Sequence, residues 1–128
     1  MDNNNITREF SFEKLEVYNQ ARKLVKQVYL LQKEFPNEER YALGDQIRRA
    51  VTSVTSNIAE GCGRSSYKEK IHFVEIAYGS LFETYSQLQN AQDLGYLRQE
   101  QVEELRPLFF SISKKLNALK NSYEQFIN

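Results

Sequence analysis

Apolar side chains recur at spacings of three and four residues along four successive stretches of this chain. That spacing puts them on one face of a helix, so each stretch is predicted to be an amphipathic helix. The predicted helices cover about residues 13–34, 42–61, 66–94 and 99–126. Each such helix needs partners that bury its apolar face, which limits the chain to a packed helical fold.

The residues predicted to face the core share this spacing in every stretch. They are Val17, Ala21, Leu24, Val28, Leu31 and Phe35 in the first; Leu43, Ile47, Ala50, Val54 and Ile58 in the second; Ile71, Val74, Tyr78, Leu81, Tyr85 and Leu88 in the third; and Val102, Leu105, Phe109, Ile112, Leu116, Leu119, Tyr123 and Phe126 in the fourth. Short connections favour antiparallel neighbours, so we predict an all-α fold, an antiparallel up-down-up-down four-helix bundle. It is expected to form a single domain over residues 1–128, with residues 1–11 a frayed N-terminal segment.

Glycine, serine and proline residues mark the predicted helix ends. Gly61–Gly63 is expected to end the second helix in the left-handed conformation that glycine adopts without strain. Ser66 and Glu69 have the spacing of a capping box at the start of the third helix, and Gly95 closes it. Pro107 lies on the polar side of the fourth stretch and predicts a kink or a split into two segments.

The charge balance argues against a very basic nucleic-acid-binding protein. The 17 lysine and arginine residues equal the 17 aspartate and glutamate residues in number, which leaves room only for a local basic patch. The lone Cys62 cannot form an intrachain disulfide, which fits a reducing compartment. The sequence shows no charged-then-apolar leader and no apolar run of about 20 residues, the length that spans a membrane. We therefore expect a cytoplasmic protein with no membrane partner.

Residues able to bind a metal or act as a nucleophile are few. Glu69 and His72 form one Glu-x-x-His pair, whereas a di-iron bundle needs two such pairs and two further carboxylates. His72 is the one histidine of the chain and is interpreted as a solvated residue of the first helical turn. Cys62 lies in a predicted turn with no dedicated base. No metal, cofactor or catalytic residue is predicted, and an enzyme is the least favoured class.

A stripe of polar residues follows one edge of the apolar face of the second helix. Its members, hereafter the polar stripe, are Gln46, Arg49, Ser53, Asn57 and Glu60. One interpretation is a solvated helix flank. The other is a hydrogen-bonded network in which Asn57 and Glu60 bond Arg49, Arg64 or the neighbouring helix. The serines and threonines around the stripe favour the network, because they are mediocre helix formers.

Five basic residues lie on the second helix, on the turn after it and at the start of the third. These candidate nucleic-acid contacts are Arg48, Arg49, Arg64, Lys68 and Lys70. Such residues can hold nucleic-acid phosphates, with an affinity that falls as salt rises. The alternative is ordinary surface charge paired within the chain, which the neutral total favours. Both interpretations stay open.

The chain also carries more apolar side chains than one four-helix core can bury. The candidate oligomer-interface residues are Leu15, Tyr18, Val25, Tyr29, Phe73 and Ile76, with Phe110 as a further surplus residue. Contiguous exposed apolar patches usually mark an interface, and a closed ring of copies buries them by symmetry. We therefore expect a homo-oligomer.

Four segments together carry a resemblance to a known family. They are Phe12–Tyr18, Leu43–Ala50, Asn57–Gly61 and Ile76–Glu83, and the motifs Gln-Ile-Arg-Arg-Ala and Asn-Ile-Ala-Glu-Gly are their most specific parts. Over about residues 12–126 the chain resembles the four-helix bundle proteins of the 23S ribosomal RNA intervening-sequence family, the S23 type. That family is bacterial and is often encoded within an insertion in the large ribosomal RNA gene.

The resemblance implies an assembly and a class of partner. Members are similar to the accessory variability protein of diversity-generating retroelements, a pentamer of four-helix protomers that binds nucleic acid and reverse transcriptase. A homopentamer is expected by this likeness, although that protein is strongly basic and this chain is neutral. The resemblance carries no enzymatic activity. The predicted function is a non-enzymatic, homo-oligomeric binding or scaffold module for RNA or a nucleic-acid-processing partner; the alternative is a structural assembly module that binds only itself or another protein.

Overall fold

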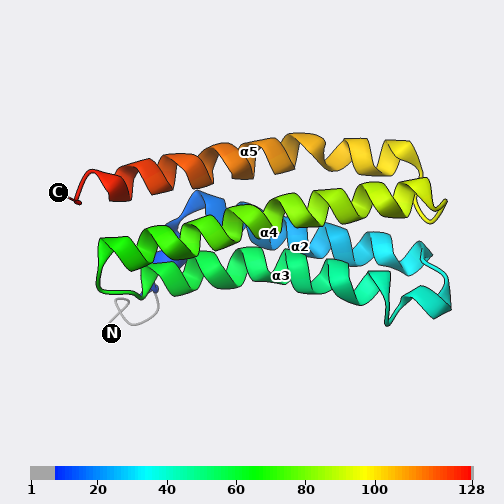
Figure 1. The fold of residues 1–128 in the computed structure, drawn as a ribbon, viewed down its shortest axis with the longest axis horizontal. Helices are drawn as coiled ribbons and strands as arrows, with labels where there is room; N and C mark the ends of the chain where they lie inside the picture. Colours follow the sequence, from blue (N-terminus) through cyan, green and yellow to red (C-terminus); the bar gives the residue numbers. More distant parts are fainter. Residues whose placement is uncertain (1–7, 128) are drawn as a thin grey trace, which may run out of the picture.

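A computed structural model describes residues 8–127 of the chain. That part contains four α-helices: α2 (Glu16–Leu31), α3 (Leu43–Cys62), α4 (Tyr67–Asp93) and α5 (Gln99–Glu124). It also contains three short 3₁₀ helices: η1 (Ser11–Lys14) before α2, and η2 (Gln32–Glu34) and η3 (Asn37–Glu39) between α2 and α3. Successive α-helices run in opposite directions (Figure 1), so the predicted all-α four-helix bundle is confirmed.

One apolar core fills the space between the four helices. Its largest fully buried aliphatic side chains are Leu24, Val28, Ile47, Val51, Val54, Ile58, Leu81, Leu88, Val102, Ile112 and Leu116. Nearly all belong to the predicted faces, because the three-four spacing puts them on one side of each helix. Val51 lies outside the predicted face and widens the buried stripe of α3.

The buried face of α4 is turned relative to the predicted one. Tyr78 and Tyr85, predicted for the core, lie half-buried at its edge. The small residues Ala77 and Thr84 take the centre and are fully buried. Small side chains let α3 pack closely, and α3 and α4 share the most extensive interface of the bundle. The Thr84 hydroxyl donates to the Ser80 carbonyl at 2.8 Å, so its burial leaves no unpaired group.

Glycine plays different roles at the ends of α3 and α4. The α3 helix continues beyond Gly61, and Gly63 after it has φ −86°, so the left-handed end predicted at Gly61–Gly63 is wrong. Gly61 is buried, and a Cβ atom there would lie 3.1 Å from the Cβ of Phe73. Close helix packing therefore explains this glycine. Gly95 has φ 82° and closes α4 as predicted.

Two further details of α4 and α5 depart in part from the predictions. The Ser66 hydroxyl accepts the Glu69 N–H at 3.1 Å, as predicted. The Glu69 carboxylate accepts from the Ser66 hydroxyl and not from its N–H, so only half of the capping box forms. The α5 helix runs unbroken through Pro107, so of the two predicted alternatives the split is wrong and the kink stays a prediction. Pro107 and Glu103, whose carbonyl loses its helical partner, are both exposed, so water can replace that bond.

The first and last described residues pack on the outside of the bundle. Of the segment predicted to be frayed, residues 1–7 lie outside the described part of the chain. The Phe12 ring lies edge-on to Tyr18, with centroids 4.8 Å apart. Phe126, predicted for the core, is exposed and stacks on Tyr67, because it lies beyond the last turn of α5.

Candidate nucleic-acid interface

The predicted nucleic-acid contacts lie at opposite ends of the bundle. Arg48 and Arg49 belong to the first half of α3, beside the connection from α2. Arg64, Lys68 and Lys70 belong to the turn into α4 and to its start. The 16 positions from Arg48 to Arg64 correspond to about 24 Å along a helix. The structure therefore brings these residues together as two groups, not as one patch.

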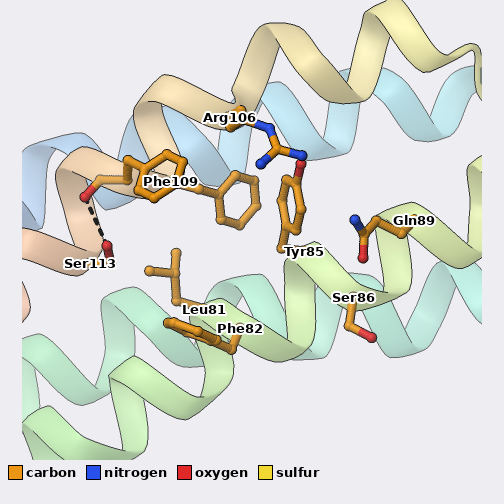
Figure 2. A pocket seen from close by; sticks show the side chains of 9 residues that line it. Leu81, Phe82, Tyr85, Ser86, Gln89, Arg106, Phe109 and Ser113 are labelled. Atoms are coloured by element: carbon orange, nitrogen blue, oxygen red, sulfur yellow. Dashed lines mark hydrogen bonds between the residues drawn. The ribbon is translucent and has the colours of Figure 1, made fainter.

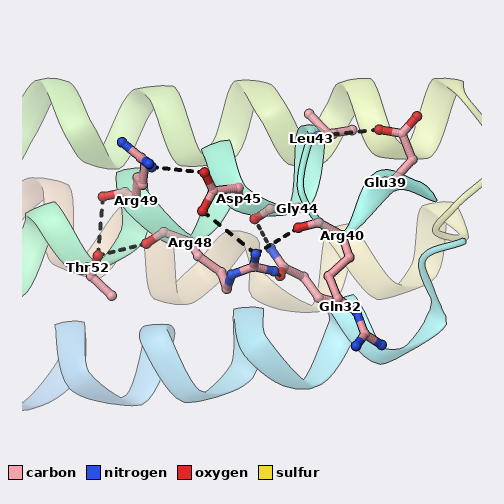
Figure 3. A network of polar contacts seen from close by, with 9 residues as sticks. All are labelled: Gln32, Glu39, Arg40, Leu43, Gly44, Asp45, Arg48, Arg49 and Thr52. Atoms are coloured by element: carbon pink, nitrogen blue, oxygen red, sulfur yellow. Dashed lines mark hydrogen bonds and ion pairs between the residues drawn. The ribbon is translucent and has the colours of Figure 1, made fainter. Parts of the chain in front are cut away.

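Arg48 ties the α2–α3 connection to the first turns of α3 (Figure 3). Its guanidinium donates to the side-chain oxygen of Gln32 and to the carbonyl of Arg40, both at 2.7 Å. The Gln32 amide in turn donates to the Gly44 carbonyl at 3.0 Å. These bonds fix the Arg48 side chain, which is mostly buried, so it presents its positive charge at a defined position.

A pocket of about 240 Å³, hereafter the α2–α3 pocket, opens beside this network. It is lined by Tyr29, Gln32, Lys33, Phe35, Pro36, Arg40, Tyr41, Gly44 and Arg48. Three of these residues are cations, and no carboxylate is among them. Tyr41 is 85% exposed and Tyr29 is 44% exposed. The pocket thus offers positive charge beside two accessible aromatic rings, which suits an anion that carries a flat ring.

Asp45 is the carboxylate next to Arg48: it bonds Arg49 at 3.0 Å and lies 3.8 Å from the Arg48 guanidinium. Two further carboxylates near this end of the bundle are engaged elsewhere. Glu34 lies 3.8 Å from Arg98 and accepts a hydrogen bond from Gln101 at 2.6 Å. Glu39 accepts from the Tyr96 hydroxyl at 2.9 Å, and this bond raises the pKa of Tyr96. These bonds hold both carboxylates toward α5 and the loop before it. Of the three pocket cations, Arg48 is thus paired with a carboxylate, whereas Lys33 and Arg40 form no ion pair within residues 8–127.

The sequence reasoning missed Lys33, Arg40 and Tyr41. Their signal is present in the sequence, because basic and aromatic residues flank Pro36 in the connection between the first two predicted helices. Spacing alone does not show that η2 and η3 fold these residues around one hollow.

At the other end of the bundle, Arg64 is held within the chain. Its guanidinium pairs with Glu60 one turn earlier and lies 3.8 Å from Glu69. It also lies over the Phe73 ring, 4.7 Å from the centroid. These contacts join the end of α3 to the start of α4. For Arg64, they agree with the interpretation of the basic residues as surface charge paired within the chain.

The two lysines of this group differ in their surroundings. Lys68 is exposed and forms no ion pair within the described chain. Lys70 is half-buried: its ammonium donates to the Cys62 carbonyl at 3.0 Å and lies 5.8 Å from the ring centre of Tyr123. Burial, and then the adjacent Cys62 thiol, raise the pKa of Tyr123 to about 12. Lys70 therefore caps the last carbonyls of α3, whereas Lys68 is a free cation in the described chain.

The middle of the polar stripe lies at the α3–α4 interface. The hydroxyls of Ser53 and Ser80 are 2.8 Å apart. The Asn57 amide donates to the Ser53 carbonyl at 2.7 Å and to its hydroxyl at 2.9 Å. The Gln87 amide donates to Gln46 at 3.1 Å across the same interface. Ser53, Ser80 and Asn57 thus form one network at the α3–α4 interface, and Gln46, the first member of the stripe, forms a separate bond across it.

The remaining members of the stripe lie in solvent. The Arg49 side chain is 81% exposed and bonds Asp45 at 3.0 Å. Glu60 is exposed and pairs with Arg64. Neither residue bonds Asn57. The Glu60–Arg64 pair is one of the bonds that the network interpretation named, whereas Arg49 fits the solvated flank, so the stripe combines the two predicted arrangements.

The residues predicted to form an oligomer interface are scattered. Leu15, Tyr18 and Val25 are half-buried against the core of their own chain. Tyr29 lines the α2–α3 pocket, and Phe73 lies beneath Arg64. Ile76 is exposed on α4. The structure therefore does not gather these residues into one face.

A different apolar surface opens between α4 and α5 (Figure 2). This hollow of about 290 Å³, hereafter the α4–α5 groove, is lined by Leu81, Phe82, Tyr85, Ser86, Gln89, Arg106, Phe109, Phe110 and Ser113. Phe82 is 55% exposed and Phe110 is 56% exposed. Arg106 closes one end, over the Tyr85 ring at 5.4 Å. Of the two exposed phenylalanines, only Phe110 was counted among the surplus apolar residues of the sequence.

Side chains that ligate metals do not gather in the part of the chain that the structure describes. Residues 8–127 hold no cluster of three or more histidine, cysteine, aspartate or glutamate side chains suited to a metal. His72 is exposed, and its ring packs edge-on against Phe73. None of the helices in this range is long and apolar enough to cross a membrane.

Four antiparallel helices around one apolar core, with its hollows on the outside, define an all-α four-helix bundle protein. Within that class the chain belongs to the 23S rRNA-intervening sequence protein family, whose family model matches residues 13–118. It is similar to the crystal structure of a protein with unknown function from the S23 ribosomal protein family of Bacteroides thetaiotaomicron. The two are 26% identical with a TM-score of 0.74, over 81% of this chain and 97% of that one. No curated protein matches the sequence.

Proposed function

We propose that this chain is a non-catalytic, homo-oligomeric module that binds RNA through the cations at the α2–α3 end of the bundle. The observation that carries the proposal is the α2–α3 pocket, where Lys33, Arg40 and Arg48 line one hollow without a carboxylate. Arg49 adds an exposed cation on the next position of α3. An RNA ligand also suits a family that is named after an intervening sequence of 23S rRNA.

The neutral total charge predicts local and modest electrostatic binding. Each phosphate contact to a single strand contributes about −0.7 to the slope of log affinity against log salt. Three contacts therefore give a slope of about −2, or roughly a twentyfold loss between 50 and 200 mM salt. Fluorescence anisotropy with a labelled single-stranded RNA measures this slope. A flat salt response, or the absence of binding at the lowest salt, contradicts the proposal.

A substitution tests the site without disturbing the core. Arg49→Ala removes an exposed cation that pairs only with Asp45 in the described chain, so the fold should be unaffected. We expect RNA affinity to fall about two- to fourfold and the salt slope to become shallower by about 0.7. Lys114→Ala, at an exposed site on α5, is the matched control and should leave the affinity unchanged.

The proposed self-association rests on the α4–α5 groove. Phe82 and Phe110 expose more than half of their surface on either side of an apolar hollow. Contiguous patches of this kind usually mark a protein interface. Light scattering of the purified chain at micromolar concentration should give the mass of an oligomer, and the family likeness points to five copies. A monomer at that concentration overturns this part of the proposal.

A second candidate is a purely structural assembly module. It is favoured by the bonds that hold Arg48 and Arg64 within the chain. This candidate predicts oligomers of the same mass that carry no nucleic acid. The ratio of absorbance at 260 and 280 nm of the purified oligomer, before and after nuclease treatment, separates the two candidates.

A further inference from the structure

We infer that the α2–α3 pocket holds one unpaired nucleotide of single-stranded RNA, with its base against Tyr41 and its phosphate on Arg40 and Lys33. This inference rests on the proposed function and names the form of RNA that the site takes. It follows from the position of the aromatic rings, the freedom of two cations and the size of the hollow.

The exposure of Tyr41 is the first argument. This ring is 85% exposed on the turn between η3 and α3, although a surface tyrosine normally packs part of its ring. Tyr29, on α2, lines the same hollow. Nucleobases stack on such rings whatever their sequence, because every base has a π face. The pocket therefore offers an aromatic platform that the bundle itself leaves uncovered.

The different surroundings of the three pocket cations are the second argument. Arg48 is fixed by Gln32 and by the Arg40 carbonyl, and Asp45 lies 3.8 Å from its guanidinium, so its charge is partly offset and it mainly shapes the pocket. The side chains of Lys33 and Arg40 are exposed and form no ion pair within residues 8–127. The Arg40 N–H donates to the Asn37 carbonyl at 3.1 Å, which fixes the backbone that carries this side chain. Two free cations on a fixed backbone suit a phosphate group.

The size of the pocket is the third argument. Its 240 Å³ lies below the roughly 300–1,000 Å³ that drug-sized ligands occupy, so it suits one flat base rather than several. The bases of a duplex are stacked on one another and cannot enter such a hollow, whereas those of loops and single strands can. The geometry therefore favours an unpaired nucleotide over a helix.

The experiment uses the full chain and three substitutions at exposed positions. We expect Tyr41→Ala to weaken binding of a labelled oligoadenylate about tenfold, which corresponds to about 1.4 kcal/mol. Tyr41→Phe keeps the ring and should stay within about twofold of the native chain. Phe126→Ala, at an exposed aromatic at the far end of the bundle, is the control and should have no effect. Circular dichroism checks that each variant keeps its helices.

Cations and competitors complete the test. The double variant Lys33→Ala/Arg40→Ala should flatten the salt slope by about 1.4, the sum of two phosphate contacts. A duplex of the same length should bind more weakly and should not respond to Tyr41→Ala. Inorganic polyphosphate, which has charge but no base, should compete poorly.

The outcomes separate the pocket from the wider proposal. If the native chain binds RNA but Tyr41→Ala, Tyr41→Phe and the control all behave alike, the pocket inference is overturned and RNA binding stands. Equal competition by polyphosphate, or an equal Tyr41 effect on the duplex, also overturns it. If the native chain binds no RNA at low salt, the proposed function and this inference fail together.

Discussion

The centre of the α3–α4 interface contains two serine hydroxyls 2.8 Å apart, those of Ser53 and Ser80. Small polar side chains suit this place, because they let the two helices approach closely and still form a hydrogen bond with each other. Asn57 extends the pair along α3 by donating to the Ser53 hydroxyl at 2.9 Å. Both hydroxyls are half-buried, so the loss of the bond between them is costly.

The first prediction measures this pair by a double-mutant cycle. Ser53→Ala and Ser80→Ala should each lower the free energy of unfolding by about 0.5–1.5 kcal/mol. The first leaves the Ser80 hydroxyl without its partner, and the second leaves the Ser53 hydroxyl with Asn57 alone. The double variant removes both groups, so it should cost less than the sum of the two. Urea unfolding followed by circular dichroism measures the coupling. Additive effects, within about 0.3 kcal/mol, contradict a direct bond.

The second prediction concerns the ionisation of Tyr123, whose pKa is raised to about 12 by burial and by Cys62. A spectrophotometric titration of the native chain should show a late tyrosinate step that Tyr123→Phe removes. The unfolded tyrosine ionises near pH 10, so the unfolded chain releases this proton first. The free energy of unfolding should therefore fall, relative to Tyr123→Phe, as the pH rises from about 10 to 12, and the difference should be constant below pH 10. Ionisation of every tyrosine near pH 10 contradicts this.

Single residues show clearly where sequence reasoning stops. The spacing of Ser53 and Asn57 on α3 is visible in the sequence, but their partner Ser80 lies 27 positions away. Arg48 was identified as a basic candidate, yet its partners are a side chain of η2 and a carbonyl of the connection. Such partners depend on the path of a short irregular segment, which helical periodicity does not specify.

At the scale of one helix, two glycines inside helices differ in how closely their neighbours pack against them. A Cβ atom at Gly61 would meet the Cβ of Phe73 at 3.1 Å, and this close approach seats α4 against the end of α3. A Cβ atom at Gly79, in the middle of α4, would meet nothing within 4 Å. Glycine in a helix interior costs about 1 kcal/mol relative to alanine. Of the two, only at Gly61 does close packing within the chain offset this cost.

The third prediction follows from this contrast. Gly79→Ala should raise the free energy of unfolding by about 0.5–1 kcal/mol, because it restricts the unfolded chain and meets no neighbour. Gly61→Leu should lower it by about 1–3 kcal/mol, because the larger side chain displaces Phe73 and separates the helix ends. Thermal and urea unfolding of both variants give the comparison. A stabilising Gly61→Leu would mean that the end of α3 is not closely packed.

Helix existence and direction were predictable, and helix rotation was predictable only in part. Spacing identified all four helices, because each has a continuous apolar face. It placed Tyr78 and Tyr85 in the core, where the structure puts the smaller Ala77 and Thr84. Both choices lie on adjacent stripes of α4. Which stripe faces the core depends on how closely α3 approaches α4, and this distance is set by both helices together.

At the scale of the whole molecule, the bundle is packed unevenly. The α3 and α4 helices share the most extensive interface, and a groove of about 290 Å³ opens between α4 and α5 (Figure 2). Phe82 and Phe110 remain largely exposed beside it. Surplus apolar residues were counted in the sequence, but their location was not predictable. Leu15 and Val25 pack against their own core, and the exposed rings gather on α4 and α5.

The fourth prediction tests whether this groove joins copies of the chain. The double variant Phe82→Ser/Phe110→Ser removes two exposed rings and spares the buried Phe109, so the monomer should keep its helices. If the groove is the interface, the mass from light scattering should drop toward that of one chain. Leu94→Ser removes an exposed apolar side chain outside the groove and should leave the mass unchanged.

The same variant links assembly to RNA binding. An oligomer presents several α2–α3 pockets, so a long RNA that reaches two of them gains affinity through a high effective concentration, often by a factor of about 100 or more. The groove variant should therefore lose affinity for a long RNA while it keeps the affinity of one pocket for a short one. An unchanged mass assigns self-association to another face. A lower mass with equal loss for both RNA lengths means instead that the pocket itself needs the assembled form.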